Sequence, residues 1–167
     1  QSAAITATSL DVTNTVAGDV VLDQNNDVAT VTITNTVGDV TYTTISSSIT
    51  DINGIQGVNI VLNTDNGVSQ SAAITATNSL TVTNAVSGDV VLDQNNDVAT
   101  VAITNAVADV TYTTNRSSTT DIAGIQGVNI NLNSENGITQ SGAITATNSL
   151  IVTNTVSEDV VLDQNND

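Results

Sequence analysis

The segment VVLDQNND occurs three times, and each copy ends in the Asp-x-Asn-x-Asp spacing that opens many calcium-binding loops. Carboxylate and amide oxygens at alternate positions are ligands that Ca²⁺ prefers. The spacing therefore makes nine residues candidate Ca²⁺ ligands: Asp23, Asn25, Asp27, Asp93, Asn95, Asp97, Asp163, Asn165 and Asp167.

The residues that complete known calcium loops do not follow this spacing. An EF-hand loop needs Gly at its sixth position and Glu at its twelfth, but the first copy has Val28 and Thr34 there. The Gly-rich nonapeptide pattern of calcium β-rolls is absent as well. We therefore favour a turn in which Asp and Asn side chains accept hydrogen bonds from nearby backbone N–H groups. Weak Ca²⁺ binding is the alternative.

A second candidate set consists of asparagines in a recurring [VI]-T-N-[TA]-V motif. In a degenerate copy, IQGV, the same place is taken by Gly57 and Gly127. Asn and Gly accept positive φ most readily, so the motif predicts a left-handed corner. If such corners stack on one another, their Asn side chains would form partial ladders of amide hydrogen bonds. Sugar binding is the alternative role for these asparagines. The asparagines are Asn14, Asn35, Asn84, Asn105 and Asn154.

Thr-x-Thr pairs are the third candidate set, because flat arrays of such pairs can order water and bind ice. An ice-binding array needs such a pair in every structural repeat on one face, whereas the stretch Gln56–Asn59 has no pair and interrupts the pattern. We expect these threonines to be ordinary exposed strand residues. The pairs are Thr6 and Thr8, Thr41 and Thr43, Thr75 and Thr77, Thr111 and Thr113, and Thr145 and Thr147.

Catalysis is not expected. The chain has no His, Cys or Lys, hence no general base near neutrality, thiolate nucleophile or Schiff-base amine. Carboxylate pairs remain, but Arg116 is the sole basic residue that could neutralise an acidic substrate. Tyr42 and Tyr112 occupy apolar strand positions and are predicted to be core residues.

The composition excludes several other classes of protein. The chain has seventeen Asp and Glu and one Arg, which gives a net charge of −16. It therefore lacks the basic surface that binds nucleic acid. No apolar run approaches the roughly 20 residues of a membrane span, so no membrane insertion is expected. Apolar content is 39% and almost wholly aliphatic, while Thr, Val and Ile favour strands.

The strongest signal is self-similarity. Leu10, Leu80 and Leu150 are equivalent, which sets the period of the sequence at 70. The chain divides into repeat 1 (1–69), repeat 2 (70–139) and a partial repeat 3 (140–167). The copies differ most where TTISSSIT, beginning at Thr43, becomes TTNRSSTT, so this stretch is predicted to be an exposed loop.

A shorter period within the repeat predicts the fold. The corner motif is followed by alternating strands such as DVVL, DVTY and NINL, dividing the second repeat into units 74–97, 98–121 and 122–143. Such small units must stack to bury their apolar faces. We predict an all-β, parallel β-solenoid of about seven coils, with roughly 22–24 residues in each coil and three coils per repeat. An immunoglobulin-like sandwich is the rival, but a repeat of this length is short for one.

By this prediction the copies of VVLDQNND lie three coils apart, about 14 Å at the spacing of stacked strands. One ion could not be shared between copies at that distance.

The segment from Asn129 to Asp167, with its phrases ITQSGAIT and DVVLDQNND, resembles the repeats of filamentous-haemagglutinin-type exoproteins, which are giant bacterial surface adhesins. The resemblance covers the whole chain and lies in the character of its repeats. It implies a right-handed β-helix, secretion, and service as a cell-surface stalk or fibre. It transfers no catalytic residue.

We therefore expect a non-enzymatic structural segment of an extracellular bacterial fibre or adhesin, and a piece of something longer because Gln1 begins within the pattern. Without polar capping coils, copies of the chain would associate head to tail or laterally. A cation-binding or glycan-binding adhesin repeat is the alternative, and an ice-binding solenoid a more distant one.

Overall fold

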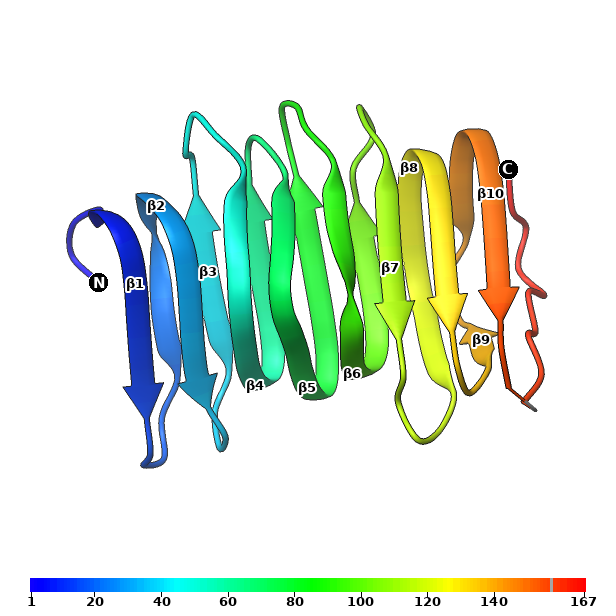
Figure 1. Cartoon of the computed structure of the whole chain (residues 1–167), viewed down its shortest axis with the longest axis horizontal. Helices are drawn as coiled ribbons and strands as arrows, with labels where there is room; N and C mark the ends of the chain where they lie inside the picture. Colours follow the sequence, from blue (N-terminus) through cyan, green and yellow to red (C-terminus); the bar gives the residue numbers. More distant parts are fainter. Residues whose placement is uncertain (157) are drawn as a thin grey trace.

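The protein is a parallel β-solenoid of about seven turns in the computed structural model, which describes residues 1–156 and 158–167. All named strands of the described chain belong to one continuous sheet that winds around the long axis (Figure 1). Every strand pairing is parallel. The predicted all-β solenoid is thereby confirmed, and the antiparallel sandwich is excluded.

The strands differ in length because the longer ones continue around a bend of the coil and so contribute to both sides. They are β1 (Thr6–Asn14), β2 (Val20–Asn35), β3 (Val40–Thr44), β4 (Thr50–Thr64), β5 (Val68–Asn84), β6 (Val90–Thr104), β7 (Val110–Thr114), β8 (Thr120–Ser134), β9 (Ile138–Gln140) and β10 (Ile144–Asn154).

Each coil is shorter than the sequence pattern predicts. One inward column of registered partners makes the spacing clear: Val20, Val40, Ile60, Leu80, Val101 and Ile122. The chain thus returns to the same position after about 20 residues, near the lower limit for a repeat that stacks on its neighbours. The predicted coil length is therefore wrong, because it is too long.

The 70-residue repeat contains three and a half coils, not three. Leu10 stacks on Val31, whereas its sequence equivalent Leu80 stacks on Ile60 in a different column. A coil has two similar halves, and the repeat contains seven of these halves, an odd number. Successive repeats are therefore turned by half a turn about the axis, and the predicted units 74–97, 98–121 and 122–143 do not correspond to coils.

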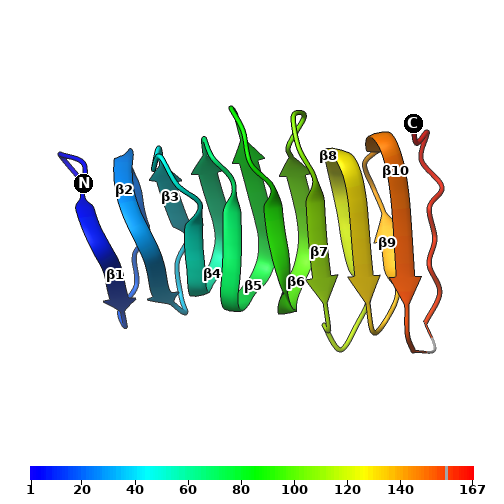
Figure 2. The same cartoon turned by 45° about the horizontal axis from the view of Figure 1, so that its top comes forward.

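This half-turn is visible in the positions of the connecting segments (Figures 1 and 2). The segment 45–49 lies along the edge drawn uppermost in Figure 1, here called the upper edge. Its copy 115–119 lies along the opposite, lower edge. Both segments fall outside the strands, as predicted for the stretch where the copies differ most.

The core is a narrow stack of aliphatic side chains between the two sides of the coil. Each inward side chain stacks on the side chain at the equivalent position of the next coil. Val, Ile and Leu therefore pack on one another throughout the described chain. Tyr42 and Tyr112 are each 1% exposed, which confirms both as core residues. They lie in columns on opposite sides, with Leu62 following Tyr42 and Leu132 following Tyr112.

The two tyrosine hydroxyls are buried without a hydrogen-bond partner among the described residues. Burial raises the pKa of the Tyr42 hydroxyl to about 12, against a smaller lowering by the nearby Thr44 side chain and a small further rise from Asp27. Burial likewise raises the pKa of Tyr112. An unpaired buried hydroxyl costs free energy because it has lost its bonds to water.

We expect Tyr42→Phe to leave the free energy of unfolding unchanged or to raise it by up to about 1 kcal/mol, because the change removes an unpaired hydroxyl and little volume. In the wild type, the unfolded tyrosine ionises near pH 10 while the folded one keeps its proton to about pH 12. The tyrosine-linked part of the stability is therefore full below pH 10 and falls between pH 10 and 12.

Urea unfolding at pH 8, 10, 11 and 12 measures both effects. The double variant Tyr42→Phe and Tyr112→Phe should lose part of the decline above pH 10. Two outcomes would contradict the interpretation: a double variant that declines as steeply as the wild type, or one destabilised by about 2 kcal/mol at pH 8.

Candidate functional site

The first two VVLDQNND segments lie inside strands β2 and β6, whereas the third, at Val160–Asp167, lies outside the named strands. The backbone bends there with a register shift between Leu22 and Asn26, but it does not leave the sheet. The predicted turn is therefore wrong for the first two copies. Asp23, Asn25 and Asp27 alternate along the outer surface and are exposed.

The residue that organises each bend is one that the sequence pattern did not single out. Asn26 and Asn96 point inward and are 0% exposed. Asn96 Oδ1 accepts hydrogen bonds from the backbone N–H of Ile74 (2.8 Å) and from Gln70 Nε2 (2.6 Å). Its Nδ2 donates to the carbonyl oxygens of Leu92 (3.1 Å) and Thr113 (2.9 Å).

This amide pair recurs with the repeat and is fully buried in the second copy. Gln1 bonds to Asn26, Gln70 to Asn96 and Gln140 to Asn166. The sequence did contain the signal, because a Gln opens each QSAAIT-like phrase at a nearly constant distance before the Asn. Gln70 follows Ile52 in an otherwise aliphatic column. A buried amide can be satisfied only in the correct register, so the pair specifies how neighbouring coils align.

We expect Asn96→Asp to lower the free energy of unfolding by about 2–4 kcal/mol, because a buried carboxylate would lose the Nδ2 donor bonds and face the carbonyl oxygens that accept them. Asn95→Asp is the matched control: the neighbouring residue is exposed, so its effect should stay within about 0.5 kcal/mol. Denaturant unfolding measures both. Equal effects of the two substitutions would show that the inward amide has no special role.

The nine candidate Ca²⁺ ligands are spread along the surface rather than gathered around a point. On an extended strand, alternate residues are about 6.6 Å apart and the first and fifth about 13 Å apart, whereas Ca²⁺ needs oxygens at about 2.3–2.6 Å. No group of three or more acidic, His or Cys side chains arranged to hold a metal is found among the described residues. Calcium binding at these positions stays a prediction.

Two further findings bear on the Ca²⁺ hypothesis. Successive copies are three and a half coils apart and alternate between the two edges, so the expected separation of three coils is wrong. In the second copy, Asp97 forms an ion pair with Arg116 at 3.1 Å, which places a guanidinium where a metal would have to bind.

We expect millimolar CaCl₂ to raise the unfolding temperature no more than NaCl of equal ionic strength, because screening of a −16 surface needs no specific site. Thermal unfolding followed by circular dichroism tests this. A larger Ca²⁺ effect that disappears in Asp23→Asn combined with Asp27→Asn would establish a real cation site in the first copy.

The motif asparagines hold bends by side-chain hydrogen bonds and not by a left-handed backbone. Positive φ occurs only at glycines among the described residues, and neither Gly57 nor Gly127 is one of them. Asn35 Nδ2 instead donates to the carbonyl oxygens of Gly18 (3.1 Å) and Asp39 (2.9 Å). The predicted positive-φ corner is wrong because a bonded Asn side chain can close the bend with ordinary φ.

The predicted partial amide ladders are confirmed in two places. Asn14 Nδ2 donates to Asn35 Oδ1 at 3.1 Å on the lower edge, and Asn84 Nδ2 donates to Asn105 Oδ1 at 3.0 Å on the upper edge. Gly57 follows Asn35 at the next coil for a packing reason. A Cβ there would lie 3.0 Å from Ile60 Cγ1 and 3.1 Å from Val40 Cγ2.

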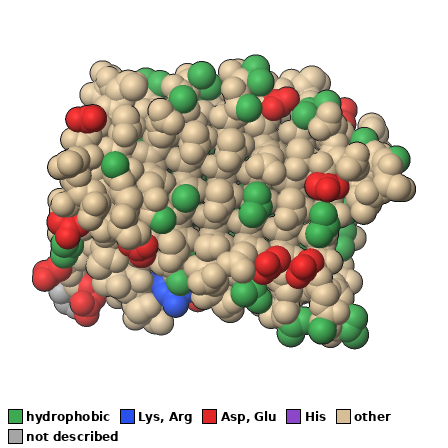
Figure 3. Space-filling model, turned by 180° about the vertical axis from the view of Figure 1, so that it is seen from behind, with side chains coloured by type: hydrophobic (Ala, Val, Ile, Leu, Met, Phe, Trp, Pro, Cys, Tyr) green, Lys and Arg blue, Asp and Glu red, His purple; other side chains and the backbone are tan. Residues whose placement is uncertain are grey.

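Some of the acidic residues have a structural role of the same kind. The Asp19 carboxylate accepts the backbone N–H of Asp39 at 3.0 Å, and the Asp39 carboxylate accepts that of Asn59 at 3.1 Å. Asp89 and Asp109 repeat the arrangement with Asn129 on the opposite edge. These carboxylates bond neighbouring coils together. On the face drawn in Figure 3, acidic side chains are scattered and do not form one cluster.

The Thr-x-Thr pairs are sorted differently from their order in the sequence. Thr41 and Thr43 lie on one face and their copies Thr111 and Thr113 on the other. Gln56 stacks between Thr34 and Thr75, so it interrupts a ladder of threonines as the sequence predicted. Its copy Gln126 lies between Thr104 and Thr145 in the same way. The actual ladder beside Thr43 is mostly short, uncharged side chains: Thr43, Asn63, Thr83, Thr104, Gln126 and Thr145.

No protein-family model, curated protein or solved structure matches the chain. The stacked parallel coils are consistent with β-helical repeat proteins in general. The likeness to filamentous-haemagglutinin-type repeats therefore rests on the recurring phrases of the sequence. The described residues contain no helix long and apolar enough to cross a membrane.

Proposed function

We propose that the chain is a non-enzymatic structural segment of an extracellular bacterial fibre or giant surface adhesin. The observation that carries the proposal is continuity: strand β5 runs through the boundary between positions 69 and 70 without a break. The repeats therefore do not form separate beads. A solenoid without internal joints is the geometry of a stiff spacer, whose length grows by one coil at a time.

The interactions along the axis support a mechanical role. Backbone hydrogen bonds between parallel strands run from coil to coil, and the aliphatic columns run in the same direction. The buried Gln–Asn pairs and the Asp-to-backbone bonds also join neighbouring coils. Bending the rod would have to break several of these contacts at once, because all of them cross the same interface between coils.

The surface chemistry agrees with a location outside the cell. The chain has no Cys or Met to oxidise and no Lys, so Arg116 is its only site for trypsin-like cleavage. The charge of −16 keeps rods apart at low salt. As partners we propose further repeats of the same chain, or copies that pack head to tail or laterally when salt screens the repulsion.

We expect electron microscopy of the native material to show thin, straight filaments, and fibre diffraction to show an axial reflection near about 4.8 Å from strands stacked along the rod. The matched control is material unfolded in denaturant, which should lose both features. Isolated globular beads, or a strand spacing perpendicular to the filament axis, would overturn the proposal.

Two alternatives keep a specific observation in their favour. Exposed carboxylates and amides on both edges suit a cation-binding or glycan-binding adhesin repeat. The ladder that begins at Thr43 places four threonines among six stacked residues, which keeps ice binding as an alternative. Thermal hysteresis in a freezing assay would favour the ice-binding alternative over the structural one.

A further inference from the structure

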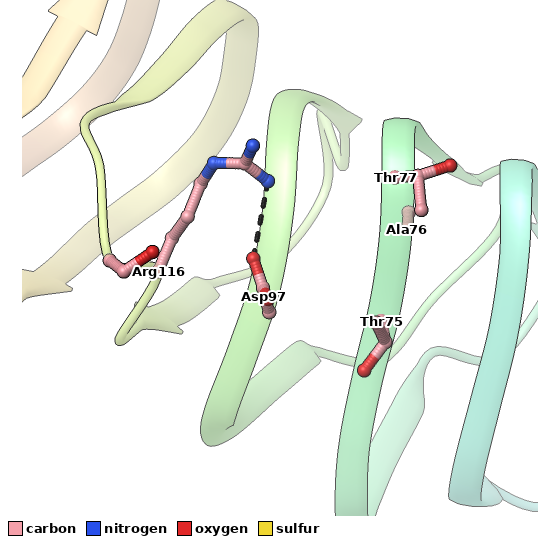
Figure 4. Close-up of a pocket in the computed structure, with 6 residues that line it drawn as sticks. Thr75, Ala76, Thr77, Asp97 and Arg116 are labelled. Atoms are coloured by element: carbon pink, nitrogen blue, oxygen red, sulfur yellow. Dashed lines mark hydrogen bonds and ion pairs between the residues drawn. The ribbon is translucent and has the colours of Figure 1, made fainter.

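The solitary arginine lies at a hollow on the lower edge of the rod. The hollow has a volume of about 230 Å³ and is lined by Thr75, Ala76, Thr77, Asp97, Arg116 and Ser117. Figure 4 shows the guanidinium of Arg116 reaching across from the loop 115–119 to the Asp97 carboxylate, with Thr75 and Thr77 on the next coil. Three coils therefore contribute to one site.

The Arg116 side chain is not needed to shape its loop. In the first repeat the same position is Ser46, and two backbone contacts of the loop are shared by both copies. The backbone N–H of Ser46 donates to Thr44 Oγ1 (3.3 Å) and that of Arg116 to Thr114 Oγ1 (3.4 Å). The Ser46 carbonyl accepts a bond from Asn66, and the Arg116 carbonyl accepts one from Asn136.

The ion pair between Arg116 and Asp97 also contributes too little to stability to explain why an arginine is present. Asp97 is 54% exposed and Arg116 26% exposed, and partly exposed pairs of this kind contribute about 0–1 kcal/mol. A second side-chain bond, from Arg116 Nε to Ser118 Oγ at 2.9 Å, holds the guanidinium in place. The pair is thus oriented at the hollow while contributing little to the fold.

The polar groups at the hollow are only partly used. The Arg116 contacts to protein are made by Nη1 and Nε, and only one Asp97 oxygen, Oδ1, accepts them. Within the described residues, no protein partner is found for the second Asp97 oxygen, for Arg116 Nη2 or for the Thr75 hydroxyl. The site therefore offers a strong acceptor, a strong donor and a neutral hydroxyl side by side.

The charges narrow the chemistry of the ligand. The carboxylate and the guanidinium neutralise each other locally, while the rest of the chain is strongly acidic and repels anions. A metal ion would have to displace Arg116 from Asp97. A neutral molecule with neighbouring hydroxyl groups fits both partners, since one hydroxyl can donate to the carboxylate and the next can accept from the guanidinium.

We propose that the Arg116–Asp97 hollow binds one neutral sugar unit of a glycan through a pair of adjacent hydroxyl groups. Its volume lies below the roughly 300–1,000 Å³ of pockets for larger ligands, which limits the site to a single ring. Without an aromatic platform the affinity of one site is low. A second such site, if linked to the first in one chain, would raise the avidity.

The proposal concerns the second repeat alone. The corresponding position in the first repeat has Asp27 and Ser46, lacks a cation, and lies on the upper edge because of the half-turn between repeats. The chain thus contains its own control. Arg116→Ser gives the second loop the residue of the first, and Ser46→Arg gives the first loop the residue of the second.

The test is a ¹H–¹⁵N NMR titration of the whole chain with methyl α-D-mannopyranoside and methyl β-D-galactopyranoside, two neutral probes that carry adjacent cis hydroxyls. We expect at least one probe to shift the amide signals of 75–77, 97 and 116–118 and to leave 6–8, 27 and 46–48 unchanged. Arg116→Ser should weaken binding at least about tenfold, since a hydrogen bond to a charged group is lost. Ser46→Arg should create a second set of shifts around 27 and 46.

Absence of shifts with both neutral probes would overturn the proposal, and so would equal shifts at the two copies or unchanged binding in Arg116→Ser. D-galacturonate tests the charge argument: we expect it to bind more weakly than the neutral probes, and tighter binding would show an anion site instead. None of these outcomes bears on the structural rod, whose own test is the filament and its axial spacing.

Discussion

The constraint on which the structure depends is the register between neighbouring coils. A coil of about 20 residues cannot bury its own apolar side chains, so each must place Val, Ile or Leu directly over the same positions of the coil before it. Parallel backbone hydrogen bonds allow many registers that differ by two residues. The inward amides make the choice specific, because Gln70 and Asn96 can satisfy each other only when the coils align as they do.

The bends follow from the same requirement. Where the chain turns from one side of the coil to the other, some backbone groups leave the ladder and need other partners. Asn35 and Asn105 bond to carbonyl oxygens across their bends, Thr44 and Thr114 bond to the preceding coil, and Asp39 accepts the N–H of the coil that follows. Many of the Asn, Thr and Asp side chains therefore serve to form hydrogen bonds with backbone groups at the bends. Because the bends recur at regular intervals, these residues have a regular spacing that resembles a binding motif.

An odd number of half-coils per repeat determines how the rod meets its surroundings. With six or eight halves, every copy of a loop would lie on one edge. With seven, the loop 45–49 and its copy 115–119 lie on opposite edges, and identical faces return only after two repeats. A long chain of this kind has no front and back. Any residue introduced in one repeat, such as Arg116, is presented on the edge opposite to its nearest sequence equivalent.

By itself the sequence determined the class of fold and the identity of the core. Alternation of aliphatic and polar residues in strands, repeats too small to fold alone, and Tyr42 and Tyr112 at apolar positions were sufficient, since these depend on local pattern and burial. The exposed loop at the variable stretch and the pairing of motif asparagines were also predictable. Each of these follows from residues close in sequence or from direct comparison of two copies.

The way the 70-residue period maps on the coils, and the choice of residue that faces inward at each bend, follow from the three-dimensional stacking of the coils. The two halves of a coil look alike in sequence, so counting motifs could not distinguish a whole coil from a half. In DQNND the alternation of the strand would allow either Asn25 or Asn26 to point inward. Asn26 is the inward residue because it bonds to Gln1, a partner that lies more than a full coil away in sequence, as Gln70 does from Asn96. Such long-range pairing is set by the register of stacked coils, and no local pattern contains it.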